Sequence, residues 1–253
     1  MRMLAVLAVV MTMALSVTGA DADDIRVFTT GAPKHVVEVL AQTYAAKGGH
    51  KIILTQDTAG GLRKRMEEGF QADIVVATPV VLDALAVSGQ VVKGTRLDFA
   101  RTGVGVGVKE GLVKPDISTV ESFKAAVIAA RAVALPDPKA GGTSAAYIEA
   151  MLKKLDIAEL VHKKVRYQAG GFAADLVASG EADLVIHQIS EIRPVKGVTY
   201  VGPLPKEIES VTTYSAALAT SGEKNAVARG LLDVFATLEA RKVVEEHSMD
   251  PVR

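Results

Sequence analysis

The 253-residue sequence contains no cysteine and no tryptophan, and only 4% of its residues are aromatic. The absence of cysteine excludes disulfide bonds, thiolate metal sites and a cysteine-linked lipid anchor. Lys+Arg and Asp+Glu each number 29, so the formal net charge is zero. Since no block of positive charge is present either, the sequence predicts no nucleic-acid partner.

Common catalytic and metal-binding motifs are also missing. The stretch Gly141-Gly142-Thr143-Ser144 lacks the lysine of a phosphate-binding loop, and no G-x-S-x-G elbow is present. None of the five histidines has the H-x-x-x-H or H-E-x-x-H spacing of a metal site. The sequence therefore predicts no cofactor, no metal and no enzymatic activity. An exported enzyme is the alternative, with His187, near Ser190 and Glu191, as its candidate group.

The first residues combine one basic residue, an apolar run from Met3 to Leu15, and small residues. This pattern predicts a secretory signal peptide over residues 1–22, cleaved after Ala22 or, alternatively, after Ala20. An uncleaved anchor is less favoured because the run is shorter than the roughly 20 residues of a membrane span. We therefore expect an exported, periplasmic protein.

The next segment repeats a strand, a polar turn and a helix three times. Strands are predicted from Asp24, at His50–Gln56 and at Ala72–Ala77, and the last is apolar enough to be buried on both faces of a parallel sheet. A helix is expected after each strand, with Pro33 and Pro79 at helix starts. Such alternation predicts a doubly wound α/β domain.

A second α/β set follows from Thr119, and two long strands are predicted at Gly103–Lys109 and Val211–Thr220. Only these strands are long enough to cross between two lobes. We expect lobe I to comprise residues 23–103 and 212–253, and lobe II residues 104–211. The last element, Asn225–His247, is predicted to be one helix.

Four short loops share a polar, glycine-rich composition and lie between a strand end and a helix start. Helix N-termini at the carboxyl ends of parallel strands present free N–H groups, which bind anions. Four such loops predict a ligand-binding cleft between the lobes. They are Thr29–Ala32, Asp57–Gly61, Ala140–Ser144 and Ala169–Gly171.

The order of motifs resembles that of the periplasmic molybdate-binding components of ABC importers. The matching segments are I-R-V-F-T-T-G-A-P, Q-D-T-A-G-G-L-R-K-R-M-E-E-G, A-D-I-V-V-A-T-P and E-A-D-L-V-I-H-Q-I-S-E. The resemblance implies a type II solute-binding fold, with two α/β lobes joined by two hinge strands that close on the ligand. It also implies an inner-membrane ABC permease as partner. We expect a monomer.

The resemblance also implies two serines and a tyrosine as ligand donors, but the matching positions here are Ala32, Ala59 and Gln188. We therefore predict a small anionic ligand, either an oxyanion or a small carboxylate, and favour an organic carboxylate or an oxyanion of a different shape over molybdate. A molybdate, tungstate or sulfate binder is one alternative, and a ligand-sensing partner of a membrane receptor is another. The predicted ligand-binding residues are Thr30, Gly31, Ala32, Thr58, Ala59, Gly60, Thr143, Ser144, Gly170, Gly171, His187 and Gln188.

Overall fold

The computed structural model of the protein describes residues 24–252, so the predicted signal peptide lies outside the described range. No helix in this range has the length and apolar character of a membrane span. The strands are β1 (Asp24–Thr30), β2 (Lys51–Asp57), β3 (Ile74–Ala77), β4 (Leu97–Lys109), β5 (Val133–Pro136), β6 (Val165–Gln168), β7 (Leu184–Gln188), β8 (Val198–Pro203), β9 (Val211–Leu218) and β10 (Asp250–Pro251).

Helices connect most of these strands. The α-helices are α1 (Lys34–Gly48), α2 (Ala59–Glu67), α3 (Pro79–Val87), α4 (Val120–Ala129), α5 (Thr143–Lys154), α6 (Ala158–His162), α7 (Ala174–Ala178), α8 (Ile189–Ile192), α9 (Ala226–Val234) and α10 (Leu238–Glu246). Short 3-10 turns lie at η1 (Pro138–Ala140), η2 (Lys206–Ile208) and η3 (Thr220–Gly222).

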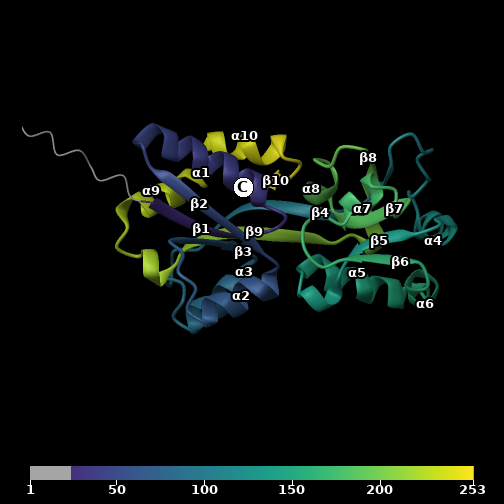
Figure 1. Ribbon diagram of the computed structural model, residues 1–253, viewed down its shortest axis with the longest axis horizontal. Helices are drawn as coiled ribbons and strands as arrows, with labels where there is room; N and C mark the ends of the chain where they lie inside the picture. The colour runs from purple at the N-terminus through teal and green to yellow at the C-terminus, as the bar shows by residue number, and fades with distance from the viewer. Residues whose placement is uncertain (1–23, 253) are drawn as a thin grey trace, which may run out of the picture.

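The first lobe is a three-layer unit around the strand order β2-β1-β3-β9-β4. Helices α1, α9 and α10 cover one face of its sheet, and α2 and α3 cover the other (Figure 1). The alternation in β1 accounts for this, because Ile25 and Val27 enter one apolar cluster and Phe28 enters the opposite one. The apolar sequence of β3 predicted that this sheet is buried on both faces, as expected for parallel strands.

The second lobe repeats this plan on a smaller sheet, in which β4 pairs with β7 and β8 and the order continues β7-β5-β6. One face packs α4, α5 and α6, with Phe123 and Leu152 fully buried. The other packs α7 and α8 through small residues such as Ala174 and through Ile192. The predicted α/β fold with two lobes is confirmed.

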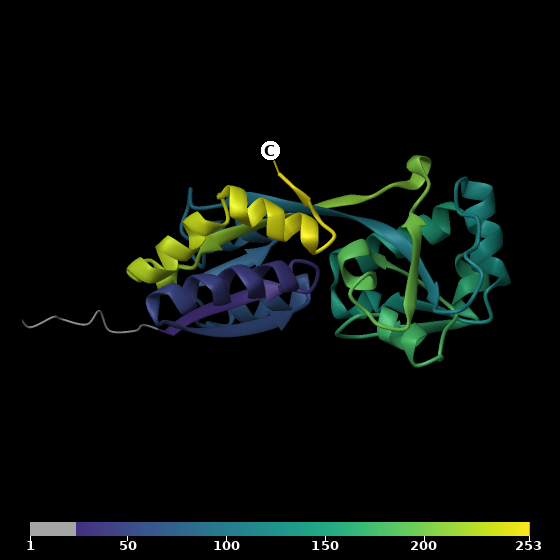
Figure 2. The ribbon, with the colours of Figure 1, turned by 90° about the horizontal axis from the view of Figure 1, so that it is seen from above.

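Strand β4 belongs to both sheets and therefore links the lobes. Its residues Leu97–Gly103 pair with β9 in the first lobe, and Val104–Val108 pair with β7 in the second. The chain returns to the first lobe through β9. Just before this strand, the carbonyl oxygen of Ser210 accepts a hydrogen bond from the Val104 N–H at 3.0 Å. Figure 2 shows both crossings side by side. The two hinge strands are as predicted, while the residue limits of the lobes stay predictions.

Glycines in β4 allow a close approach of other chain segments. A Cβ at Gly105 would lie 2.8 Å from the carbonyl oxygen of Gly202 in β8, and one at Gly107 would lie 2.7 Å from the Ile192 side chain. Both distances are shorter than real Cβ contacts allow. Gly105 therefore allows the backbone of β8 to approach closely, and Gly107 makes room for side chains that pack on the strand.

The prediction of one helix over Asn225–His247 is wrong. The chain forms α9 and α10 with a break between them, because Thr237 caps the second helix and accepts a hydrogen bond from the Ala240 N–H at 3.1 Å. At the break, Phe235 packs edge-on against Phe99 with ring centroids 4.8 Å apart. Thr237 in the sequence could have indicated a second helix start, but the apolar periodicity continues across it.

Candidate ligand-binding cleft

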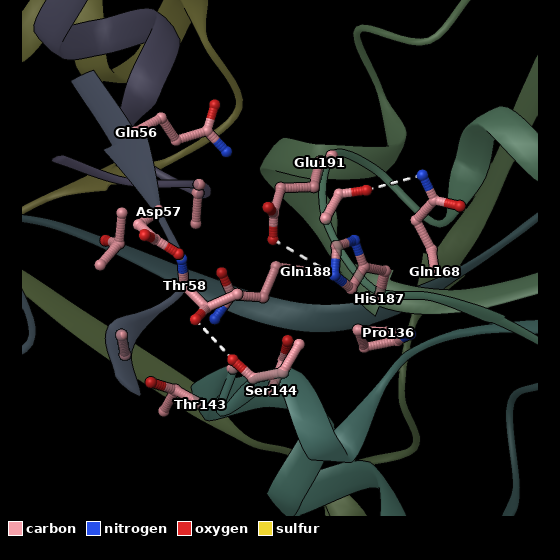
Figure 3. Close-up of a pocket in the computed structure, with 18 of the residues that line it drawn as sticks. Gln56, Asp57, Thr58, Pro136, Thr143, Ser144, Gln168, His187, Gln188 and Glu191 are labelled. Atoms are coloured by element: carbon pink, nitrogen blue, oxygen red, sulfur yellow. Dashed lines mark hydrogen bonds and ion pairs between the residues drawn. The ribbon is translucent and has the colours of Figure 1, made fainter. Parts of the chain in front are cut away.

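A cavity of about 330 Å³ lies where the carboxyl ends of β1, β2, β5, β6 and β7 meet. Figure 3 shows Gln56, Asp57 and Thr58 on its first-lobe side and Pro136, Gln168 and His187 on the other. The structure brings together all of the predicted binding residues except Gly60. Those that line the cavity are Thr30, Gly31, Ala32, Thr58, Ala59, Thr143, Ser144, Gly170, Gly171, His187 and Gln188.

Gly60 instead joins the lobes at the edge of the cleft. Its N–H donates to the Gly141 carbonyl oxygen at 3.0 Å, and the Thr58 hydroxyl donates to the Ala140 carbonyl oxygen. A Cβ at Gly60 would lie 3.3 Å from the Gly141 Cα, so the two backbones are in direct contact. The lobes therefore touch across the cleft through main-chain groups.

Two helix N-termini face this cavity from opposite lobes. At α2 the Gly61 N–H donates to the Thr58 cap at 3.1 Å and the Gly60 N–H donates to Gly141, so this helix start offers the cavity its dipole and the Ala59 N–H. At α5 the N-cap position is Gly142, which has no side chain to cap the first turn. The N–H groups of the first turn of α5, beside Thr143 and Ser144, are thus suited to an anion.

The cavity also contains side chains that the sequence reasoning did not assign to the site. Tyr214 reaches it from β9, and its hydroxyl donates to Gln188 Oε1 at 2.7 Å, while Gln188 Nε2 donates to Thr212 Oγ1 at 3.3 Å. Gln188 is therefore held in one orientation. A strand-interior tyrosine carries no local signal of a binding site. Gln56, Asp57 and Gln168 lie in the last two residues of a strand, and this position could have identified them, whereas Glu191 lies in α8.

Anion binding here would depend on neutral donors and helix ends, because none of the described residues that line the cavity is Lys or Arg. Its two aspartates already have partners. Asp57 accepts from the Thr58 N–H at 2.8 Å and lies 3.5 Å from Arg65 Nη1, and Asp137 accepts from the Lys139 N–H at 2.8 Å. These contacts reduce the repulsion that free carboxylates would exert on an anion.

His187 and Glu191 form a buried pair in the wall of the cleft, with His187 Nε2 at 3.5 Å from Glu191 Oε2 (Figure 3). Burial lowers the pKa of His187 to about 4 and raises the pKa of Glu191 to about 8. Both groups are therefore neutral at pH 7. An unperturbed imidazole becomes charged below about pH 6.5, whereas burial keeps His187 neutral there.

Two polar atoms of the cavity wall have no hydrogen-bond partner among the described residues. They are Thr30 Oγ1 and His187 Nδ1, and both are buried. A buried polar atom without a partner costs about 1–3 kcal/mol, so each is a candidate contact for a polar ligand. Within residues 24–252, no three His, Cys, Asp or Glu side chains are grouped so as to hold a metal ion.

The sequence profile of a family described as bacterial extracellular solute-binding proteins matches residues 25–250. The chain belongs to this family. The resemblance to molybdate-binding components, inferred from the motif order, is thus confirmed at the level of family and fold.

Two solved structures show the shared fold. A periplasmic molybdate-binding protein from Azotobacter vinelandii superposes with a TM-score of 0.75 at 17% identity, covering 90% of this chain and 100% of that one. The sulfate-binding protein SubI from Mycobacterium tuberculosis superposes with a TM-score of 0.67 at 17% identity, covering 91% and 87%.

A relative of different description matches most of the chain. It is an aconitate isomerase from a Pseudomonas species, 29% identical over 234 residues, which cover 90% of this solute-binding protein and 88% of the relative.

Proposed function

We propose that this solute-binding protein captures a small polycarboxylate in the cleft between its lobes. The observation that carries the proposal is the convergence of separate donor groups on one cavity: the Ala59 N–H at the start of α2, the first-turn N–H groups of α5, the Gly170–Gly171 turn and the unpartnered Thr30 hydroxyl. Each is suited to one carboxylate oxygen, and they lie on different walls.

The cavity favours an extended organic anion over a compact tetrahedral one. Ala32 and Ala59 line it where short hydroxyl donors would be needed to enclose a tetrahedral ion. Three glutamine amides, those of Gln56, Gln168 and Gln188, add donors and acceptors at separate points. A volume of about 330 Å³ lies at the lower end of the range for small-molecule pockets. The relative described as an aconitate isomerase acts on a tricarboxylate, which supports this ligand class.

In this proposal the protein works outside the cytoplasm, in the periplasm, after removal of the signal peptide. The lobes close about the crossings in β4 and β9, and the closed form delivers the ligand to an inner-membrane ABC permease. Membership of the solute-binding family supports this role.

Isothermal titration with cis-aconitate, trans-aconitate, citrate, molybdate and sulfate tests the proposal. We expect a tricarboxylate to bind at least tenfold more tightly than either oxyanion. Thr30→Val, which removes the unpartnered hydroxyl, should weaken tricarboxylate binding by about 10- to 100-fold, since a hydrogen bond to a charged group contributes about 1.5–3 kcal/mol. Ser118→Ala, which removes a hydroxyl from an exposed loop of the second lobe, is the control and should leave affinity unchanged. Tight molybdate binding with no tricarboxylate binding would refute the proposal.

One observation favours a second candidate function, the isomerisation of the bound tricarboxylate. The relative described as an aconitate isomerase aligns with 90% of this chain, and the cavity holds a titratable pair that simple capture of a ligand does not require. Conversion of cis-aconitate to trans-aconitate by the purified protein, followed by proton NMR, tests this candidate.

A further inference from the structure

His187 and Glu191 both belong to the second lobe. His187 lies in β7 and Glu191 in α8, and the chain turns directly from one element into the other. The exposed fractions of the two side chains are 4% and 9%, yet both residues line the cavity. The pair is thus withdrawn from solvent and open to a ligand.

Burial sets the protonation of both groups in opposite senses. With the pKa of His187 lowered to about 4 and that of Glu191 raised to about 8, the imidazole is a free base and the carboxyl holds its proton over the same pH range. The other titratable group that interacts with Glu191 is Tyr214 on β9, whose pKa burial raises so that it stays neutral. A base and an acid therefore lie 3.5 Å apart with no permanent charge between them.

The first lobe approaches the same carboxyl closely. A Cβ at Gly31 would overlap Glu191 Oε1, so the glycine allows the turn after β1 to lie directly against this oxygen. His187 Nε2 faces the other oxygen of Glu191, which leaves His187 Nδ1 as the nitrogen without a partner among the described residues. The pair therefore lies where ligand and both lobes meet.

We propose that His187 and Glu191 are an acid–base pair that moves a proton between two carbons of an unsaturated polycarboxylate held in the cleft. This inference rests on the proposed binding of a polycarboxylate and assigns the chemistry of the same site to two residues.

The reaction is a 1,3-proton shift in an allylic acid such as aconitate. The neutral imidazole takes a proton from the methylene carbon next to a carboxylate, and that electron pair forms the new double bond. The old double bond shifts its electrons to the far carbon, which takes the proton of Glu191. The product is an isomer of the same formula, so no oxidant, reductant or water is consumed.

The pair can then reset itself. The shift leaves an imidazolium and a carboxylate 3.5 Å apart, and after the product leaves, His187 Nδ1 loses a proton to water while Glu191 takes one from water, which restores the starting base and acid. Negative charge that spreads over the ligand carboxylates in the transition state lies near the N-termini of α2 and α5, which stabilise it. General acid–base catalysis of this kind contributes about 10²–10⁴-fold in rate.

The test measures binding and conversion separately. The protein is titrated calorimetrically with cis-aconitate and trans-aconitate, and conversion of each is followed by proton NMR. Glu191→Gln and His187→Gln should slow conversion at least about 100-fold while affinity changes less than about tenfold. The matched controls, Glu207→Gln and His162→Gln on exposed surfaces, should convert at the wild-type rate.

A pH profile of the wild-type protein adds a readout that does not depend on the folding of either variant. The rate should fall as pH rises through about 8, where Glu191 loses its proton. Conversion that persists unchanged in both variants, or that does not fall on this alkaline side, overturns the assignment.

Wild-type protein that binds either isomer without converting it overturns this inference and leaves the proposed binding function intact. Failure to bind either isomer refutes the proposed function itself.

Discussion

Two of the histidine–glutamate pairs among the described residues have opposite electrostatics. In the second lobe, His162 of α6 lies 3.0 Å from Glu149 of α5 at the surface, whereas His187 and Glu191 are 3.5 Å apart inside the cleft. The pKa of Glu149 is lowered, and the pKa of Glu191 is raised to about 8. The same two residue types therefore give a readily ionised carboxylate in one place and a neutral acid and base in the other.

Solvent access and neighbouring charge explain the difference. Burial is the largest single effect on Glu149 and raises its pKa, but the hydrogen bonds and charge interactions of His162 and Lys153 together outweigh it, so the pKa is lowered. The exposed fraction of the Glu149 side chain is 20%, so water also stabilises its carboxylate. Glu191 is more deeply buried, and burial is the cause of its shift. Depth therefore decides which pair is suited to proton transfer.

The largest expected difference between the two pairs is the loss of stability when the histidine is removed. His187→Ala leaves a cavity beside a buried carboxyl, and we expect it to lower the free energy of unfolding by about 2–3 kcal/mol. His162→Ala removes an exposed partner and should cost less than about 1 kcal/mol. Urea unfolding of both variants at pH 7, followed by circular dichroism, measures the difference. Equal costs would show that His187 is not packed as described.

The second-largest expected effect is the pH dependence of the free energy of unfolding that the neutral pair produces. The pKa of Glu191 is raised from 4.5, so its contribution to stability is complete below pH 4.5 and is lost as pH rises to about 8. The pKa of His187 is lowered from 6.5, so its contribution is complete above pH 6.5 and is lost as pH falls to about 4. Between pH 6.5 and 8 only the loss due to Glu191 continues.

Glu191→Gln should remove this alkaline loss. At about 1.4 kcal/mol per pH unit, wild-type protein should lose about 2 kcal/mol relative to the variant between pH 6.5 and 8. Urea unfolding of both proteins at a series of pH values gives the difference directly. Parallel curves over this range would mean that Glu191 is already ionised in the folded protein.

A smaller effect is expected where the first lobe touches the pair. Gly31→Ala forces the Glu191 carboxyl to move, and because only the end of a flexible side chain must shift, we expect a cost of about 1 kcal/mol. Gly170→Ala in the same cleft meets no atom within 4 Å and should cost less. Thermal unfolding at pH 7 compares them. A larger cost for Gly170→Ala would contradict the contact between Gly31 and Glu191.

The sequence predicted the parts of this molecule that depend on local pattern. Alternating strands, turns and helices predicted the α/β lobes, and the glycine-rich loops at strand ends predicted most of the cavity wall. The break between α9 and α10 was missed because apolar periodicity continues across the Thr237 cap. Tyr214 was missed because its place in the cavity depends on how β9 crosses between the lobes.

The two histidine–glutamate pairs show why site chemistry was harder to predict than the fold. The spacing of His187 and Glu191 is visible in H-Q-I-S-E, but the sequence does not give the burial that shifts their pKa values. Glu149 and His162 lie in different helices, so their pairing depends on how α5 packs against α6.

The smallest effect is expected at the exposed pair, and its sign is opposite to that of Glu191. Because the pKa of Glu149 is lowered from 4.5, its contribution is present above pH 4.5 and is lost as pH falls through the folded value. Glu149→Gln should therefore destabilise the protein at pH 7 by no more than about 1 kcal/mol, and added salt should reduce the difference. Urea unfolding at pH 7 and pH 3, each at low and high salt, tests this, and Glu121→Gln on the exposed start of α4 is the control. If Glu149→Gln instead stabilises the protein at pH 7, the Glu149 carboxylate gains nothing from His162 and Lys153 and the contrast with the cleft fails.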